Sequence, residues 1–147
     1  STIATVRGPG RAPEKEEVCV LKHVGIHHVS INVTDLERAK AFYRDVIGLT
    51  EIDRPPFAFA GAWFAVGESG QQLHLIVHDG ETMRRGGIDT HDGHFAIRVA
   101  SYRDAIAWLE RCGVPYEARP HPTAGFPQIY VLDPDRNVIE INAERLD

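Results

Sequence analysis

Cysteine is scarce in this chain: only Cys19 and Cys112 occur among its 147 residues. Two cysteines are too few for a disulfide framework, and they do not form a CxxC pair, so a reducing, cytoplasmic compartment is expected. Long apolar runs are also lacking, because no stretch reaches the length of a membrane span. The N-terminal residues show no apolar core of a signal peptide. These absences predict a soluble protein with no membrane partner.

Basic residues are outnumbered by acidic ones. The 16 Lys and Arg against 21 Asp and Glu give a formal net charge of −5. A negative chain is a poor partner for a nucleic-acid backbone or an anionic membrane, so both are excluded as main partners. The hydrophobic fraction of 43% and the charged fraction of 25% are ordinary for a globular protein. A chain of this length is sufficient for one domain with a sizeable core.

The N-terminal segment differs in composition from the rest. Residues 1–22 contain two glycines, two prolines and the charge run at 14–17. This composition predicts an extended, flexible arm. The alternative, an arm packed on a neighbouring subunit, stays open at this point. We expect residues 23–147 to form a single domain.

That domain divides into two halves of similar design, one over residues 24–79 and the other over residues 93–143. Each half is expected to hold a strand, an amphipathic helix and three short strands. In the first half, Thr34 and Glu37 have capping-box spacing at the helix start, and Gly48 is a C-terminal stop. In the second half, the helix begins near Ser101, presents Cys112 on its apolar face, and ends at Gly113. The strands are expected at 25–33, 49–53, 62–66 and 72–77, then at 94–99, 114–118, 128–133 and 137–142. The prediction is an α+β fold of two tandem βαβββ modules.

Four residues with metal-binding side chains follow the repeat. His28 and His94 are 66 positions apart, and so are His74 and Glu140. Because strand side chains alternate between faces, all four fall on the face opposite the apolar residues. Three imidazoles and one carboxylate on one concave surface predict a metal site formed by His28, His74, His94 and Glu140. We therefore expect a curved, partly open mixed sheet around a metal cleft.

The chain also resembles a known family, through three motifs and the repeated module. The motifs are H-V-x-I-x-V-x-D-L-x-x-A-x-x-F-Y-x-D-V-I-G-L at 28–49, G-H-F-A-I-R-V at 93–99 and D-P-D-R-N-V-I-E-I at 133–141. They are similar to the vicinal oxygen chelate superfamily, which includes glyoxalase I, extradiol dioxygenases and bleomycin-resistance proteins. The resemblance covers residues 24–143 and places the family's metal positions on the same four residues. It also implies a homodimer that binds a small molecule. Whether one site is built within one chain or across two stays open.

The ligand set implies a particular chemistry. It suits one divalent ion per site, namely zinc, nickel, iron(II), cobalt or manganese. Four protein ligands leave an octahedral ion two neighbouring positions, which a substrate with adjacent oxygens can fill. The ion then acts as a Lewis acid, and Glu140 is the candidate catalytic base. The leading hypothesis is therefore a metal-dependent lyase or isomerase of the glyoxalase-like group.

Two other functions are kept as alternatives. An iron(II) extradiol-type dioxygenase is the first, although its usual set of two histidines and one carboxylate leaves three positions open rather than two. A binding protein for an antibiotic or another small molecule is the second. His74 is a departure from glyoxalase I, which resembles this pattern but carries glutamate at that position. The glyoxalase reaction itself therefore does not follow from the pattern.

Four further residues are predicted to contact the substrate. Phe59 and Trp63 belong to the aromatic stretch at 57–64 and are candidates for gripping an apolar or planar group. Arg98 shares a face with His94 and is a candidate for binding a substrate carboxylate; an ion pair with a nearby acid is the alternative. Tyr130 is expected in the cleft, and its alternative is core packing, since a shift of 66 residues places it on Phe64.

Overall fold

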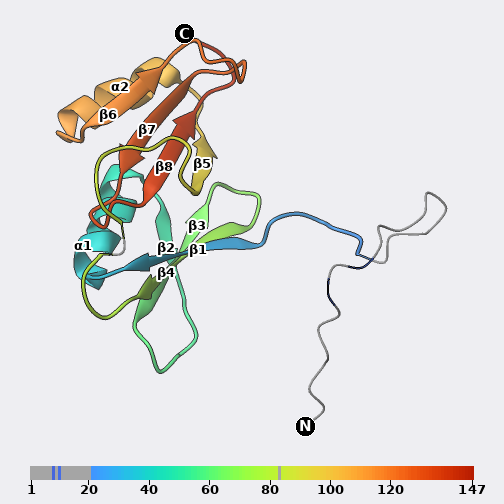
Figure 1. Cartoon of the computed structure of the whole chain (residues 1–147), viewed down its shortest axis with the longest axis vertical. Coiled ribbons are helices and arrows are strands. Elements are labelled where there is room, and N and C mark those ends of the chain that lie inside the picture. The colour runs from blue at the N-terminus through green and yellow to red at the C-terminus, as the bar shows by residue number, and fades with distance from the viewer. Residues whose placement is uncertain (1–7, 9, 11–20, 83) are drawn as a thin grey trace.

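The two halves form two separate modules. The computed structural model describes residue 8, residue 10, residues 21–82 and residues 84–147. Cys19 and most of the predicted arm lie outside the described residues. Each module contains one mixed four-stranded sheet and one helical segment, and Figure 1 shows one module above the other. This confirms the predicted α+β fold of two tandem modules.

The first module begins at β1 (His28–Val33), which is followed by α1 (Leu36–Ala41) and the π-helical turn η1 (Phe42–Val46). Strands β2 (Thr50–Ile52), β3 (Gly61–Val66) and β4 (Gln71–Val77) complete it. The strand order is β1-β4-β3-β2. The β1–β4 pair is parallel, whereas β3 pairs antiparallel with both of its neighbours. The first and last strands of the module therefore lie side by side.

The second module repeats this arrangement. It contains β5 (His94–Arg98), α2 (Tyr102–Arg111), β6 (Tyr116–Arg119), β7 (Gln128–Leu132) and β8 (Val138–Asn142). The strand order is β5-β8-β7-β6, and the β5–β8 pair is again parallel. The predicted strands are all present, with bounds that differ by a few residues. No helix among the described residues is long and apolar enough to cross a membrane.

The helix starts follow side-chain capping, but one cap differs from the prediction. Asp35, not Thr34, caps α1, because its carboxylate accepts a hydrogen bond from the Arg38 N–H. Ser101 caps α2 and accepts from the Asp104 N–H. Cys112, expected on the apolar face of this helix, is exposed at the C-cap. Gly48 follows the first helical segment with φ +81° and Gly113 follows the second with φ +67°, so both helix stops are confirmed.

One hydrophobic core joins the two modules. Side chains from the helices and from both sheets pack together in it, and burial of each large aliphatic side chain is worth about 1.5–3 kcal/mol. Its fully buried members include Val33, Tyr43, Phe64, Leu73, Leu75, Leu109, Ile129, Val131 and Ile139. The apolar faces of the strands are thus turned inward. The opposite faces of the strands remain available for polar side chains.

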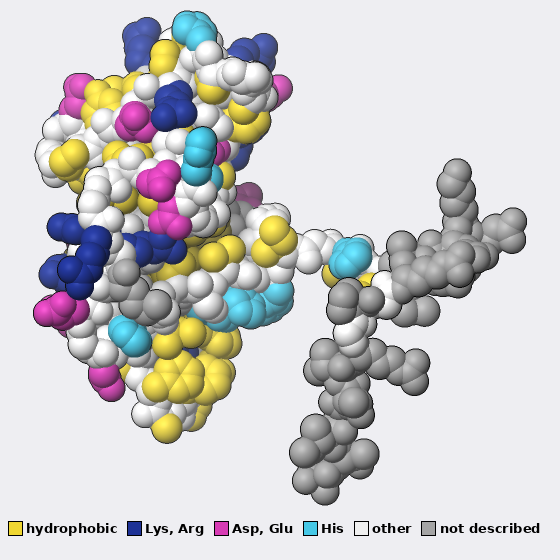
Figure 2. Space-filling view, viewed as in Figure 1, with side chains coloured by type: hydrophobic (Ala, Val, Ile, Leu, Met, Phe, Trp, Pro, Cys, Tyr) yellow, Lys and Arg dark blue, Asp and Glu magenta, His cyan; other side chains and the backbone are white. Residues whose placement is uncertain are grey.

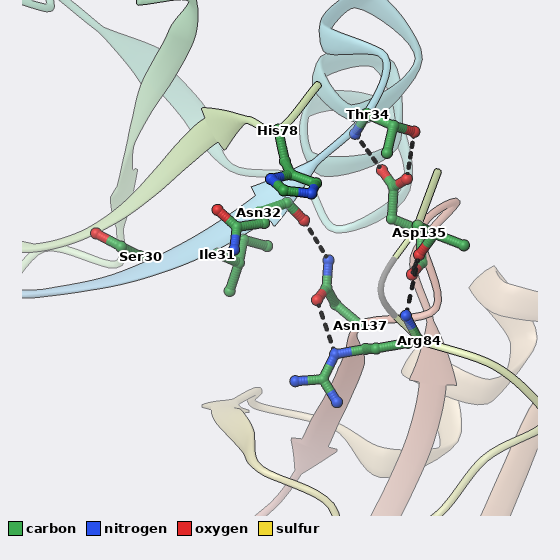
Figure 3. Close-up of a pocket in the computed structure, with 9 residues that line it drawn as sticks. Ser30, Ile31, Asn32, Thr34, His78, Arg84, Asp135 and Asn137 are labelled. Atoms are coloured by element: carbon green, nitrogen blue, oxygen red, sulfur yellow. Dashed lines mark hydrogen bonds between the residues drawn. The ribbon is translucent and has the colours of Figure 1, made fainter. Parts of the chain in front are cut away.

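Hydrogen bonds fix one module against the other where the β7–β8 turn meets the end of β1. The Asp135 carboxylate accepts from the backbone N–H and the hydroxyl of Thr34. The Asn137 side-chain amide donates to the Asn32 carbonyl, and Arg84 Nε donates to Asn137 Oδ1. Figure 3 shows these contacts around a cavity of about 160 Å³. The relative placement of the modules therefore rests on both apolar packing and directional polar contacts.

Residues 21–27 leave the body of the molecule before β1 begins. They form no helix or strand, and the chain before Ile26 extends away from both sheets (Figure 1), whereas the His27 carbonyl accepts a hydrogen bond from the Gln72 N–H on β4. Leu21, Val24 and Ile26 are highly exposed here, with Val24 fully in solvent. Three exposed aliphatic side chains therefore lie on one short segment beside β1.

Candidate metal centre

The first pair of predicted ligands comes from adjacent parallel strands. His74 on β4 lies opposite Ser30 on β1, and His28 is two residues before Ser30 on the same strand face. The rings of His28 and His74 stack with their centroids 4.1 Å apart and an angle of 15° between planes. His27 Nδ1 lies 2.8 Å from His28 Nδ1, so one of these two rings donates to the other. The structure therefore brings His28 and His74 together.

His74 lies in an environment that favours a neutral imidazole. Its side chain is buried, and Trp63, directly opposite on β3, stacks on it with centroids 4.1 Å apart and an angle of 2°. Its Nε2 lies 2.8 Å from Gln72 Oε1. Burial lowers the pKa of His74, and the neighbouring His28 and His27 lower it further. A neutral ring is the form that can bind a metal ion.

The second pair comes from β5 and β8. His94 Nε2 lies 3.4 Å from Glu140 Oε1. His94 Nδ1 lies 2.7 Å from the backbone carbonyl of Asp92, which can only accept, so Nδ1 carries a proton. In the neutral ring this leaves the lone pair on Nε2, on the side of Glu140. In metal-binding histidines, the ring nitrogen that does not bind the metal typically donates a hydrogen bond to a carbonyl or carboxylate, as Nδ1 does here.

Glu140 is buried and held at both oxygens. Oε1 accepts from the Tyr130 hydroxyl at 2.9 Å and lies 3.4 Å from Gln128 Nε2. Oε2 accepts from Asn142 Nδ2 at 2.6 Å. Arg98 Nε in turn donates to Asn142 Oδ1, which orients that amide. The carboxylate is therefore fixed in position and surrounded by donors.

The two pairs do not meet within one chain. Among the residues that the structure describes, no group of three or more His, Cys, Asp and Glu side chains is placed to hold a metal ion. The first pair lies on the sheet of module one, and the second lies on the sheet of module two. Each pair alone offers two ligands, which is fewer than zinc or iron sites in proteins use.

The predicted aromatic contacts lie beside the first pair. Phe57 and Phe59 in the β2–β3 loop stack on each other, and Phe57 lies 6.1 Å from Trp63 between ring centroids. Both phenylalanines are nearly half exposed. Figure 2 shows hydrophobic side chains gathered over this loop, with histidine side chains next to them. Rings that are stacked and exposed form an apolar surface next to His74.

The predicted contacts of module two lie beside the second pair. Arg98 donates to the Asn142 amide oxygen and lies over the Phe126 ring, so the partner of its guanidinium here is an amide rather than an acid. Tyr130 lies directly opposite Glu140 in the β7–β8 register, whereas Phe64 lies opposite Leu73 in the core. The equivalence of Tyr130 and Phe64 under a shift of 66 residues is therefore wrong. Trp63 is the true counterpart of Tyr130.

A constant shift of 66 residues fails for Tyr130 because the turns that precede His74 and Glu140 differ in length. Trp63 and Tyr130 are 67 positions apart, whereas His74 and Glu140 are 66 apart. The turn between β7 and β8 is thus one residue shorter than its counterpart, which a constant shift along the sequence does not reveal. Three polar partners were also missed: Gln72, Gln128 and Asn142. Strand alternation could have found Gln72 and Asn142, since each is two residues from a predicted ligand and shares its face.

Comparison with known proteins agrees with the fold and the repeated module. Residues 25–141 match the Glyoxalase/Bleomycin resistance protein/Dioxygenase superfamily. Because the match covers most of the chain, the protein belongs to this superfamily.

Several solved structures are similar to this chain. A protein assigned to the glyoxalase family from Bacillus anthracis is 26% identical with a TM-score of 0.69, covering 84% of this chain and 97% of its own. The trypanothione-dependent glyoxalase I of Leishmania major is 28% identical with a TM-score of 0.60, covering 83% and 88%. TnmS3, an antibiotic-binding protein from Streptomyces sp. CB03234, is 26% identical with a TM-score of 0.65, covering 85% and 98%. An enzyme and a binding protein are thus similar to this chain at nearly the same identity.

Proposed function

We propose that this protein is a divalent-metal-dependent enzyme of the glyoxalase-like group. It would act as a lyase or isomerase on a small substrate that presents two adjacent oxygens. The metal ligands would be His28, His74, His94 and Glu140. The observation that carries the proposal is that two separate pairs of ligand-type side chains are each already assembled, at 4.1 Å between ring centroids and at 3.4 Å between Nε2 and Oε1.

The donor chemistry of these pairs fits a borderline divalent ion such as zinc, nickel, iron(II), cobalt or manganese. Burial favours the neutral form of His74, and His94 Nδ1 donates a hydrogen bond to the Asp92 carbonyl. Glu140 supplies the single negative charge. A divalent ion held by these residues would act as a Lewis acid towards the substrate oxygens. Glu140 would accept a proton from the substrate, with the Tyr130 hydroxyl and the Asn142 amide holding the carboxylate in position.

The site would be completed by a second copy of the chain. Since the pairs lie on different sheets of one chain, a homodimer with twofold symmetry can bring module one of one chain against module two of its partner. Each dimer would then contain two identical sites, each with four ligands. The exposed Leu21, Val24 and Ile26 next to β1 support association, because contact with a partner would remove apolar surface from water.

Metal analysis tests the ligand set. We expect about one divalent ion per chain in the purified protein. His74→Ala and Glu140→Ala should each lose most of that ion, whereas His121→Ala, a change at an exposed histidine outside both pairs, should retain it. Full occupancy in either ligand variant would exclude that residue from the site.

A mixing experiment tests the shared site. His74→Ala chains and Glu140→Ala chains are unfolded together, refolded and compared with each variant refolded alone. A mixed dimer has one site in which all four ligands are intact, so the mixture should recover about one quarter of the wild-type metal content and activity. If each site lay within a single chain, every site in the mixture would be defective. No recovery in folded mixed dimers would therefore contradict the shared site.

The second candidate function is small-molecule binding without catalysis. The stacked, half-exposed Phe57 and Phe59 beside Trp63 favour it, since they offer a flat apolar surface. Similarity to TnmS3 is in line with this function. The two functions differ in their response to a chelator. Binding of an aromatic ligand that is unaffected by EDTA, together with no metal in the purified protein, would favour the binding protein over the enzyme.

A further inference from the structure

A broad cleft opens next to the second ligand pair. It has a volume of about 640 Å³, and its lining includes Thr90, His91, Arg119, His121, Gln128 and Tyr130. Gln128 and Tyr130 form the wall nearest the candidate metal centre, because both reach Glu140. A molecule in this cleft is thus separated from Glu140 by the thickness of one side chain.

The lining of this cleft carries a cationic side chain, although the chain as a whole is acidic. The chain carries a formal net charge of −5. The described residues that line the cleft include no Asp or Glu, and Arg119 supplies a permanent positive charge among them. Local positive charge in an acidic protein attracts anions into the cleft.

Arg119 is free enough to bind a ligand. Its guanidinium lies over the Tyr130 ring, 5.8 Å from the centroid, so it faces the inner wall of the cleft. Its acidic partner is Glu117, at 3.5 Å, and both side chains are nearly half exposed. An exposed ion pair of this kind contributes little, so an acidic ligand can compete for the guanidinium. A planar guanidinium also matches the two oxygens of a carboxylate.

We infer that this cleft binds an acidic group of the substrate, a carboxylate or a phosphate, through Arg119. The inference rests on the proposed function for the position of the reacting oxygens. It assigns the substrate to the class of small organic anions: one end presents adjacent oxygens at the metal centre, and the acidic end lies between Arg119 and the loop that carries His121. Arg119 is here a substrate-binding residue that takes no part in the chemical step.

The test uses benzoate and its neutral counterpart benzamide as probes. Each is titrated into the purified, 15N-labelled full-length protein, and binding is followed through backbone amide resonances. We expect benzoate to shift the amide resonances of Arg119, His121 and Thr123, since the prolines between them have no N–H. It should bind at least about fivefold more tightly than benzamide, because a charge-assisted hydrogen bond is lost in the amide. Equal affinity for the two probes would overturn the inference.

Three variants test whether Arg119 supplies the positive charge that benzoate contacts. Arg119→Gln should weaken benzoate binding about fivefold, while Arg119→Lys should retain part of it. Arg103→Gln, a change at an exposed arginine on α2, should leave the affinity as in the wild type. Unchanged benzoate affinity in a folded Arg119→Gln protein would overturn the inference, as would an equal loss in Arg103→Gln.

Metal analysis separates this inference from the proposed function. Arg119→Gln should retain the full metal content, since Arg119 contacts none of the four proposed ligands. The titration is also repeated after EDTA treatment. Benzoate binding that persists and still depends on Arg119 supports the acidic subsite even if the protein holds no metal. Benzoate binding that disappears with the metal and ignores Arg119 overturns the subsite while leaving the metal centre in place.

Discussion

Tyr130 is one of the residues that hold Glu140 in position. Its hydroxyl donates to Oε1 at 2.9 Å, and burial together with Glu140 raises the pKa of Tyr130 to about 12. The phenol therefore stays protonated and keeps its role as a donor at physiological pH. A carboxylate with such a partner is already oriented before any ligand arrives.

Tyr130→Phe removes that donor while keeping the ring. We expect the affinity for zinc or nickel to fall by about tenfold, as is typical when a residue that hydrogen-bonds to a metal ligand is removed. Isothermal titration calorimetry measures the change. Tyr116→Phe is the matched control, because Tyr116 donates to the exposed Glu110 and not to Glu140. Equal metal affinities in the two variants would contradict a positioning role for Tyr130.

Protonation of the Asp133 carboxylate makes the stability of the folded protein depend on pH. Its side chain is buried, and desolvation raises its pKa above 3.8, although hydrogen bonds from Asn137 and Tyr43 offset part of the rise. A raised pKa in the folded state favours the protonated form. The stability that Asp133 contributes is therefore fully present below pH 3.8 and is lost as the pH rises through the folded-state pKa.

Asp133→Asn removes this titration. We expect the variant to be less stable than the wild type, because Asp133 accepts hydrogen bonds at both carboxylate oxygens, whereas Asn has one acceptor oxygen and turns its NH2 group towards two of these donors. The deficit in the free energy of unfolding should shrink as the pH rises from about 4 to 7. Urea denaturation across this range measures it, with the exposed Asp53→Asn as control. A deficit that stays constant or grows with pH would contradict a raised pKa for Asp133 in the folded protein.

At the scale of elements, β3 depends on the absence of a side chain at Gly61. A Cβ atom at this position would overlap the backbone carbonyl oxygen of Leu75 on β4 and would lie 3.1 Å from the Arg54 guanidinium. The carbonyl belongs to the sheet and cannot move without breaking the β3–β4 pairing. Only glycine allows this close approach.

Gly61→Ala should therefore lower the free energy of unfolding by about 1–3 kcal/mol. Gly87→Ala is the control, since a Cβ there meets open space at an ordinary backbone conformation, and its effect should stay within about 0.5 kcal/mol. Thermal or urea denaturation compares the two. A Gly61→Ala protein as stable as the control would show that β3 tolerates a wider spacing from β4.

The order of the elements could be predicted from the sequence, because hydrophobic periodicity and the glycine stops are local signals. The details of the helix start could not. Thr34 and Glu37 have capping-box spacing, yet Thr34 bonds Asp135 of the other module and Asp35 caps the helix. A contact across 101 positions leaves no local pattern. The exposure of Cys112 likewise depends on where α2 ends, and helix ends are poorly defined by periodicity.

At the scale of the whole molecule, the strand face that each proposed ligand occupies could be predicted, but the separation of the four residues into two pairs could not. Alternation along a strand decides which face His28, His74, His94 and Glu140 occupy. The placement of one module relative to the other depends on the shared core and on the contacts of Asp135 and Asn137, none of which follows from a repeat distance. The cleft at Arg119 was missed for the same reason.

The extended segment before β1 should affect self-association. Burying Val24 and Ile26 against a partner would contribute about 1.5–3 kcal/mol each. The double variant Val24→Asp with Ile26→Asp should therefore raise the dimer dissociation constant by at least about tenfold, measured by sedimentation velocity. Leu146→Asp, at an exposed leucine near the C-terminus, is the control. A double variant that dimerises like the wild type would exclude this segment from the interface.

Because Trp63 stacks flat on His74, its intrinsic fluorescence can serve as a probe of that histidine. Because the two rings are in direct contact, a ligand or ion that binds His74 should change the environment of the indole and therefore its emission. The chain has two tryptophans, and the other, Trp108, is exposed and donates to the Val46 carbonyl. Replacing Trp108 with Phe would therefore leave one fluorophore that reports occupancy of His74 directly, without a label.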